Sequence, residues 1–207
     1  MEKILEHTTE EFLQFQKIAR FSRDIIITEK IDGTNAQVYI TEYGDVIAGS
    51  RKRYITPSDD NHGFAVWVEG NKNELLKLGP GRNYGEWWGG PINRGYGLPK
   101  GEKYFSMFNT IRWCAYGETP ARIHKEDPRI EKYQEILPEC CRLVPVLYHG
   151  AFLTDKIEEA LTDLQQKGSY AAPGFMNPEG IVIFHPAANI CFKKTIKNDE
   201  IPKSFVT

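Results

Sequence analysis

The sequence predicts an α+β fold with largely antiparallel sheets flanked by helices. Short segments rich in β-branched residues recur along the chain and are joined by turns, whereas helical spacing of apolar residues is confined to a few segments. The two kinds of segment do not alternate regularly, as they would in a fold built from βαβ units. With 207 residues, of which 41% are hydrophobic and 26% charged, the whole chain 1–207 is expected to form a single domain.

The first expected elements are a helix and three strands. The helix begins near Thr8 and carries Phe12, Phe15 and Ile18 on one face. The strands are expected at residues 24–30, 34–41 and 46–50, where β-branched residues are bounded by turn residues.

The rest of the chain predicts two more helices and five short strands. One helix covers residues 63–78, and another begins at a capping Asp155 and stops at Gly168. The strands are expected at residues 82–88, 103–108, 143–148, 180–184 and 189–195. Between two of them, the glycine-rich loop 88–103 is either a tolerated insertion or a mobile element over a site.

Composition excludes several classes of protein. There are 26 basic and 28 acidic residues, so the net charge of −2 excludes a uniformly basic nucleic-acid binder. No apolar run approaches the roughly 18 residues of a membrane span, and no secretory signal is visible. The four cysteines and five histidines lack metal-ligand spacing, which predicts reduced, buried thiols in a cytoplasmic protein and no histidine-based metal site.

The first chemical signal is Lys30, which ends an apolar strand and is followed by a turn at Gly33. A lysine in this position is costly unless its amine is paired or functional. Burial or neighbouring cations can make a neutral lysine amine a nucleophile, and Gly33 would let the backbone approach a ligand closely. The structural alternative is a solvated lysine in a hairpin loop.

Further motifs along the chain supply the other groups that phosphoryl-type transfer needs. They are the cations 51–53, the carboxylate Glu86 between aromatic residues, the aromatic segment 105–108, the carboxylate Glu179 before a strand, and Lys193 with Lys194. Each alone has a structural explanation as a turn, a core aromatic or a solvated charge. Together they provide an amine nucleophile, phosphate-binding cations, carboxylates and a stacking aromatic.

In this order the motifs resemble those of the covalent nucleotidyltransferase superfamily of polynucleotide ligases and mRNA capping enzymes. The segment Glu29-Lys30-Ile31-Asp32-Gly33-Thr34-Asn35 is most similar to the RNA ligase 2 type of ATP-dependent RNA ligase. Six collinear motifs between Lys30 and Lys193 carry the resemblance. It implies a nucleotidyltransferase fold, the ATP-grasp-like fold of ligase adenylation domains.

The resemblance also implies a role for each motif residue. Lys30 would attack the α-phosphate of ATP, Lys193 would contact that phosphate, and Glu179 would bind Mg²⁺ or Mn²⁺. The other implied nucleotide contacts are Glu29 and Asp32 beside the nucleotide, Asn35 in the later steps at the 5′-phosphate, Arg51 on phosphate or ribose, Glu86 on a ribose hydroxyl, and Phe108, or else Phe105, stacked on adenine.

The implied activity is ATP-dependent RNA ligation, which would serve RNA repair. After lysyl–AMP forms, AMP would pass to an RNA 5′-phosphate, and a 3′-hydroxyl would displace it. A DNA ligase or a GTP-using capping-type guanylyltransferase is one alternative, which the continuation Thr34-Asn35 argues against. A non-catalytic nucleotide- or RNA-binding module is another, opposed by the intact lysine and carboxylate motifs.

The sequence departs from the family pattern in two places. Thr195 stands where the family often has a second lysine, and only 14 residues follow Lys193, too few for an OB fold or another C-terminal domain. RNA would then be held by a basic patch on the domain itself or with the help of an RNA-binding or end-healing partner protein. The expected patch comprises Arg51, Lys52, Arg53, Arg82, Arg94, Lys100 and Lys103.

Overall fold

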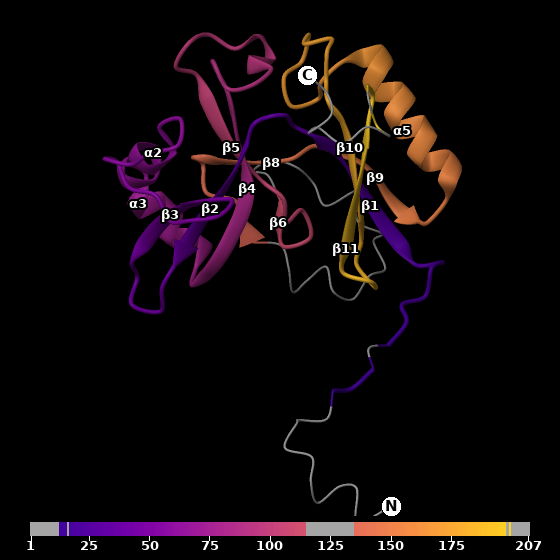
Figure 1. Cartoon of the computed structure of the whole chain (residues 1–207), viewed down its shortest axis with the longest axis horizontal. Helices are drawn as coiled ribbons and strands as arrows, with labels where there is room; N and C mark the ends of the chain where they lie inside the picture. The colour runs from indigo at the N-terminus through magenta and orange to yellow at the C-terminus, as the bar shows by residue number, and fades with distance from the viewer. Residues whose placement is uncertain (1–12, 16, 115–134, 198, 200–207) are drawn as a thin grey trace, which may run out of the picture.

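The protein is built from two β-sheets that lie side by side, with helices on their outer sides (Figure 1). The computed structural model describes residues 13–15, 17–114, 135–197 and 199. Among the described residues, six of the eight strand pairs are antiparallel and two are parallel, so the α+β class with largely antiparallel sheets is confirmed.

The first sheet has four strands in the order β11 (Ile190–Thr195), β10 (Gly180–His185), β1 (Asp24–Lys30) and β9 (Val146–Ala151). Helix α5 (Thr154–Lys167) packs on one face of it. Ile25 and Ile27 of β1 point to that face and meet Leu164 of the helix, and all three are fully buried. The opposite face of the sheet therefore stays clear of the helix and is turned toward the second sheet (Figure 1).

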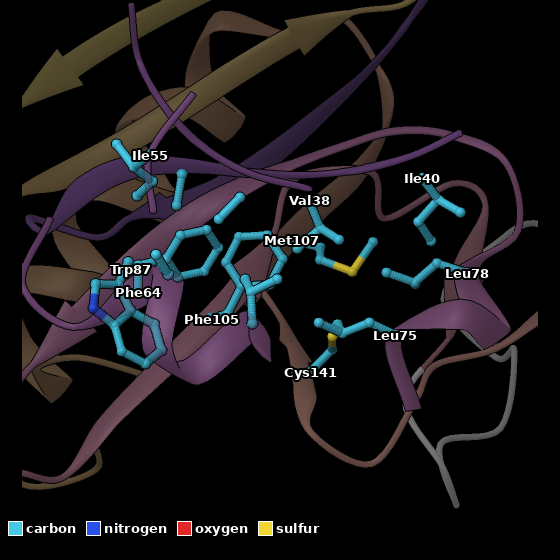
Figure 2. Close-up of a cluster of buried hydrophobic side chains, with 14 of the residues drawn as sticks. Val38, Ile40, Ile55, Phe64, Leu75, Leu78, Trp87, Phe105, Met107 and Cys141 are labelled. Carbon is cyan, nitrogen blue, oxygen red and sulfur yellow. The ribbon is translucent and has the colours of Figure 1, made fainter. Parts of the chain in front are cut away.

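The second sheet has five strands in the order β3 (Val46–Ser50), β2 (Thr34–Ile40), β4 (Gly81–Gly89), β5 (Lys103–Met107) and β8 (Cys141–Leu143). Its outer face is covered by α2 (Phe64–Gly70), α3 (Lys72–Leu75) and the 3-10 turn η1 (Leu76–Leu78). Figure 2 shows the core beneath these helices, where the rings of Phe64, Trp87 and Phe105 pack together. The remaining elements are the 3-10 turn η2 (Gly95–Gly97) and the parallel pair β6 (Trp113–Cys114) and β7 (Glu135–Ile136).

The chain crosses between the sheets twice at one place. Residues 31–33 join β1 to β2, and residues 144–145 join β8 to β9. The second crossing is hydrogen-bonded to a strand of each sheet, because Glu29 of β1 donates its N–H to the Pro145 carbonyl at 2.9 Å and Val144 donates its N–H to the Met107 carbonyl of β5 at 3.1 Å. The end of β1, where Lys30 lies, is thereby held beside residues 144–145 at the junction of the two sheets.

Three sequence-based boundaries differ from the structure. The strand expected at 143–148 is two strands in different sheets, because Pro145 has no N–H to continue a ladder. The helix expected at 63–78 is divided into α2, α3 and η1 at Gly70 and Asn71. Asp155 does not cap α5, whose N-cap is Leu153, but lies in the first turn, where its charge favours the helix dipole.

The N-terminal helix is not found in the part of its span that the structure describes. Residues 13–15 and 17–20 have no secondary structure, and the rest of the expected helix, from Thr8 to Phe12, lies outside the described residues. Leu13, Phe15 and Ile18 are 89%, 83% and 87% exposed, so no tertiary contact stabilises an amphipathic face there.

Two further expectations concern cysteines and membranes. Cys140, Cys141 and Cys191 are free thiols, as predicted, but the expectation that they are buried is wrong for Cys191, which is exposed, and Cys140 is only partly buried. Within the described ranges, no helix has both the length and the apolar character that a bilayer crossing requires.

The two aromatic candidates on β5 have different environments. Phe105 is fully buried against Phe64 and Trp67, so it is not available to stack on a ligand, whereas Phe108 is 45% exposed.

We expect Phe105→Ala to lower the free energy of unfolding by about 3–5 kcal/mol, as cavity-forming substitutions do. Phe108→Ala should cost about 1 kcal/mol or less. Urea denaturation of both variants would measure this, and equal losses would contradict the assignment.

Candidate functional site

Lys30 and Glu179 meet at the junction of the two sheets. Lys30 is opposite Gly180 in the register of β1 and β10, which brings Glu179 beside it. The Lys30 ammonium donates a hydrogen bond to the Glu179 carboxylate; the side chains are 22% and 3% exposed. Removing one partner of such a pair would leave the other charge poorly compensated. The predicted lysine is therefore paired rather than solvated, and one side of it remains open.

Glu86 approaches the same junction from β4 of the second sheet. Its Oε1 accepts a hydrogen bond from the Gly33 N–H at 3.0 Å, and its Oε2 accepts one from Asn35 Nδ2 at 3.1 Å. Burial raises the pKa of Glu86 to about 7, although the Gly33 N–H and the charge of Lys30 lower it. Glu86 thus changes its protonation state near neutral pH.

Gly33 has a different role from the one expected. A Cβ at this position would lie 2.4 Å from the Trp87 carbonyl oxygen and 2.7 Å from Trp88 Cβ. The close approach that requires glycine is therefore to the β4 backbone. This approach is what places the Gly33 N–H within hydrogen-bonding distance of Glu86.

The glycine-rich loop 88–103 holds the lysine turn in place. Arg94 Nε donates to Asp32 Oδ2 at 3.0 Å, while its Nη1 donates to the Asn177 carbonyl at 2.9 Å. Asn93 Nδ2 donates to Asp32 Oδ1 at 3.1 Å. Arg94 was expected to contribute to an RNA-binding patch, but it instead links the turn after Lys30 to the segment before Glu179.

Tyr96 of the same loop also holds the turn after Lys30, from the buried side. Its φ of +53° lies in the left-handed region, which is costly for a bulky residue. The ring is buried between Trp88 and Phe175, with centroid separations of 5.1 and 4.8 Å, and the hydroxyl oxygen accepts the Asp32 N–H at 2.7 Å. Burial raises the pKa of Tyr96, so the phenol stays neutral. Sequence analysis missed Tyr96; the dense glycines around it were the available signal.

Glu29 is adjacent to Lys30 in sequence but points to the other face of β1. Its carboxylate accepts hydrogen bonds from Ser169 Oγ at 2.6 Å, the Tyr170 N–H at 2.8 Å and the Ala171 N–H at 2.9 Å. Burial nevertheless raises the pKa of Glu29. The side chain anchors the turn after α5, and its implied contact with a nucleotide stays a prediction.

Strand alternation decides which C-terminal lysine belongs to the site. Lys193 is opposite Val182, which is opposite Thr28, so Lys193 shares the face of Lys30 and is exposed there. Lys194 points to the α5 side and forms an ion pair with Glu158 at 3.4 Å. Thr195, the departure from the family pattern, shares the face of Lys193.

The other expected site residues lie at the edge of this region. Arg51 follows the end of β3 and is exposed. Phe108 follows β5 and donates its N–H to the Tyr84 carbonyl at 3.0 Å, which holds the backbone beside β4.

The carboxylates suit a hard divalent cation that also binds a phosphorylated substrate. Mg²⁺ takes oxygen ligands and commonly uses one or two carboxylates together with substrate phosphates. Glu179 and Glu86 supply such oxygens, and they are close enough for the charge of Glu179 to raise the pKa of Glu86. Among the described residues there is no cluster of three or more metal-binding side chains. A cation on these carboxylates would complete its coordination with oxygens of the substrate or of water.

A comparison with protein families and a comparison with solved structures both find RNA ligases. The sequence model of the RNA ligase family matches residues 23–197. A Naegleria gruberi RNA ligase variant solved with ATP and Mn is similar with a TM-score of 0.55 and 15% identity, over 86% of this chain and 51% of that one. An apo variant of the Naegleria gruberi ligase has a TM-score of 0.54 and 17% identity, over 84% of this chain and 50% of that one. An archaeal ATP-dependent RNA ligase has a TM-score of 0.53 and 16% identity, over 87% of this chain and 48% of that one.

At these identities the structural likeness shows the fold alone. The chain spans about half the length of the solved structures that it matches. No curated protein matches the sequence.

The raised pKa of Glu86 predicts a pH-dependent stability. The native state binds a proton at Glu86 that the unfolded state releases between pH 4.5 and 7, so stability should fall as the pH rises through this window. Glu86→Gln should flatten that decline by up to about 3 kcal/mol, at about 1.36 kcal/mol per pKa unit. Urea denaturation across the window would measure it, with Glu69→Gln, an exposed glutamate of α2, as the control. Parallel curves for Glu86→Gln and the unsubstituted protein would contradict the assignment.

The two contacts of Arg94, with Asp32 and with the Asn177 carbonyl, predict that lysine cannot fully replace it. A lysine can pair with Asp32 but cannot also reach the Asn177 carbonyl with a second rigidly placed N–H group. We expect Arg94→Ala to lower the free energy of unfolding by about 1–3 kcal/mol and Arg94→Lys to recover only part of it. Arg53→Ala, which removes an exposed pair with Asp59, should cost about 1 kcal/mol or less. Full recovery by lysine would show that only the ion pair matters.

Proposed function

The chain belongs to the RNA ligase family, and we propose that it is an ATP-dependent RNA ligase that joins an RNA 5′-phosphate to a 3′-hydroxyl. The observation that carries this proposal is the Lys30 amine, hydrogen-bonded to Glu179 at an open junction that also contains Glu86 and faces Lys193. A lysine that was merely solvated would not need a buried carboxylate as its hydrogen-bond partner.

In the first step, Lys30 Nζ attacks the α-phosphate of ATP. A phosphorus–nitrogen bond forms and the bond to the leaving pyrophosphate breaks, which gives lysyl–AMP. The ammonium must lose one proton before it attacks and a second as the phosphorus–nitrogen bond forms. The Glu179 carboxylate already accepts a hydrogen bond from it and takes one of them, while the other passes to the leaving pyrophosphate or to water. Glu179 is thus placed to receive a proton from the nucleophile.

The remaining groups bind and orient the nucleotide. Lys193 and Arg51 offset phosphate charge, Glu86 accepts a hydrogen bond from a ribose hydroxyl, and Phe108 stacks on adenine. Glu179, together with phosphate oxygens, would hold Mg²⁺ or Mn²⁺, which supplies further charge neutralisation.

In the later steps, AMP passes to the RNA 5′-phosphate and the 3′-hydroxyl displaces it. Asn35, whose side-chain amide donates to Glu86, would contact the 5′-phosphate in these steps. Catalysis in both steps is mostly positioning and charge compensation.

We assign the two-sheet architecture to the nucleotidyltransferase fold, with the chain as one adenylylating domain. The likeness to ligase structures at TM-scores of 0.53–0.55 supports this assignment. The free thiols favour a reducing, cytoplasmic location. An RNA-binding or end-healing partner protein belongs to the same proposal.

The decisive test is covalent labelling. Protein stripped of bound AMP with pyrophosphate should become labelled by ATP that carries a radioactive α-phosphate, and Lys30→Ala should abolish the label. Lys194→Ala is the matched control, because that lysine is paired with Glu158 on the α5 side, and it should remain labelled. GTP in place of ATP tests the capping-type alternative.

A second arm separates loss of chemistry from loss of folding. Lys30→Ala should still seal RNA that already carries a 5′-adenylyl group, since that substrate bypasses the first step. Retained labelling in Lys30→Ala would move the nucleophile to another residue. Absence of any label in the unsubstituted protein would refute ligase–AMP formation.

A further inference from the structure

The face of the second sheet that turns away from α2 continues from the site along β2 and β4. Asn35 is opposite Glu86, and two residues farther along Gln37 is opposite Tyr84. Tyr39 and Arg82 form the next pair on this face. Because alternate residues of a strand share a face, these pairs form one row that begins at the Glu86 carboxylate.

The far part of this row is preorganised. The Arg82 guanidinium lies 4.2 Å from the centroid of the Tyr39 ring and 5.7 Å from that of Tyr54. The two tyrosine rings are 6.3 Å apart and inclined by only 23°. Arg82 Nη1 also donates to Gln37 Oε1 at 3.2 Å. A ligand would therefore meet side chains whose rotamers are already restricted, which lowers the entropic cost of binding.

These side chains are also accessible. Tyr54 and Tyr84 are 47% and 54% exposed, so about half of each side chain is open to a ligand. Tyr84 lies between the Arg82 stack and Glu86, so the exposed rings lead from the stack toward the site.

The charge of this face suits an anionic strand better than an apolar partner. The β2, β3 and β4 residues that share it are Asn35, Gln37, Tyr39, Ile47, Gly49, Arg82, Tyr84, Glu86 and the buried Trp88. Glu86 is the one acidic residue in this set, and it belongs to the site. Arg82 is cationic, and the exposed Arg51 and Lys52 follow β3 near Asn35.

We propose that Tyr39, Tyr54, Arg82 and Tyr84, which we call the β-platform, hold the single-stranded RNA next to the end that is joined. The inference rests on the proposed ligase function and names the surface that grips its substrate. Bases stack on the exposed rings of Tyr54 and Tyr84, and Arg82 meets the phosphate backbone. The four residue steps from Glu86 to Arg82 span about 13 Å, room for roughly three or four stacked nucleotides.

The test measures RNA binding without chemistry. A fluorescently labelled, 5′-phosphorylated single-stranded RNA is titrated with Lys30→Ala protein and followed by anisotropy. In that background, Tyr84→Ala should weaken binding about tenfold, whereas Tyr84→Phe should bind like the parent because it keeps the ring. Arg82→Gln should weaken binding and reduce the slope of log affinity against log salt by about 0.7.

Two matched variants control for general surface effects. Tyr43→Ala removes a tyrosine that is 96% exposed in the turn after β2, and Lys77→Gln removes an exposed cation beside the helices. Both should bind RNA like the parent. The β-platform is refuted if Tyr84→Ala and Arg82→Gln bind RNA as tightly as the parent, or if the controls lose as much affinity.

The outcome is separable from that of the proposed function. With Lys30 intact, the β-platform variants should be labelled by ATP like the unsubstituted protein. Normal labelling with unchanged RNA affinity refutes the β-platform alone, while absent labelling in the unsubstituted protein refutes the ligase mechanism alone. If Tyr84→Ala does not fold, the salt slope of Arg82→Gln still decides the question.

Discussion

The rest of the structure depends on keeping the Lys30–Glu179 pair half-buried at the junction of two sheets. Such a pair gains little unless its geometry is fixed, because removing both charges from water is costly. The register of β1 against β10 supplies that geometry by placing Glu179 next to Gly180, opposite Lys30. At Gly180 a Cβ would lie 2.2 Å from the Lys194 carbonyl oxygen, so the neighbouring strand depends on the same glycine.

Strand alternation then gives adjacent residues separate tasks. On β1, Glu29 is used to anchor the turn after α5, while Lys30 faces the junction. On β11, Lys194 forms an ion pair with Glu158 of α5, while Lys193 faces the site. A slip of one residue in either register would exchange these tasks, so the buried isoleucines that fix the register also determine which amine is available for chemistry.

Sequence reasoning succeeded where a short-range pattern carries the information. The β-branched segments predicted most strands. Lys30 was marked by its place at a strand end, Glu86 by its place between aromatic residues and Glu179 by its place before a strand, and the structure brings the three together. It failed where a residue's role depends on a partner distant in sequence. Arg94 was assigned to the surface because nothing near it shows that its partner is Asp32, 62 residues away. Phe105 and Phe108 look alike in sequence, and only the packing of α2 on β5 separates them.

The glycine-rich loop shows why such roles are hidden from local patterns. Its path requires left-handed backbone at Asn93 and Tyr96, neither of which is glycine, and propensity alone argues against that conformation. The conformation is stabilised by burial of the Tyr96 ring and by hydrogen bonds to the turn after Lys30. Local strain is thus offset at the position where the two sheets must be held together. The loop belongs to the scaffold of the site, and the solvent face of β2 and β4 is left as the open surface beside it.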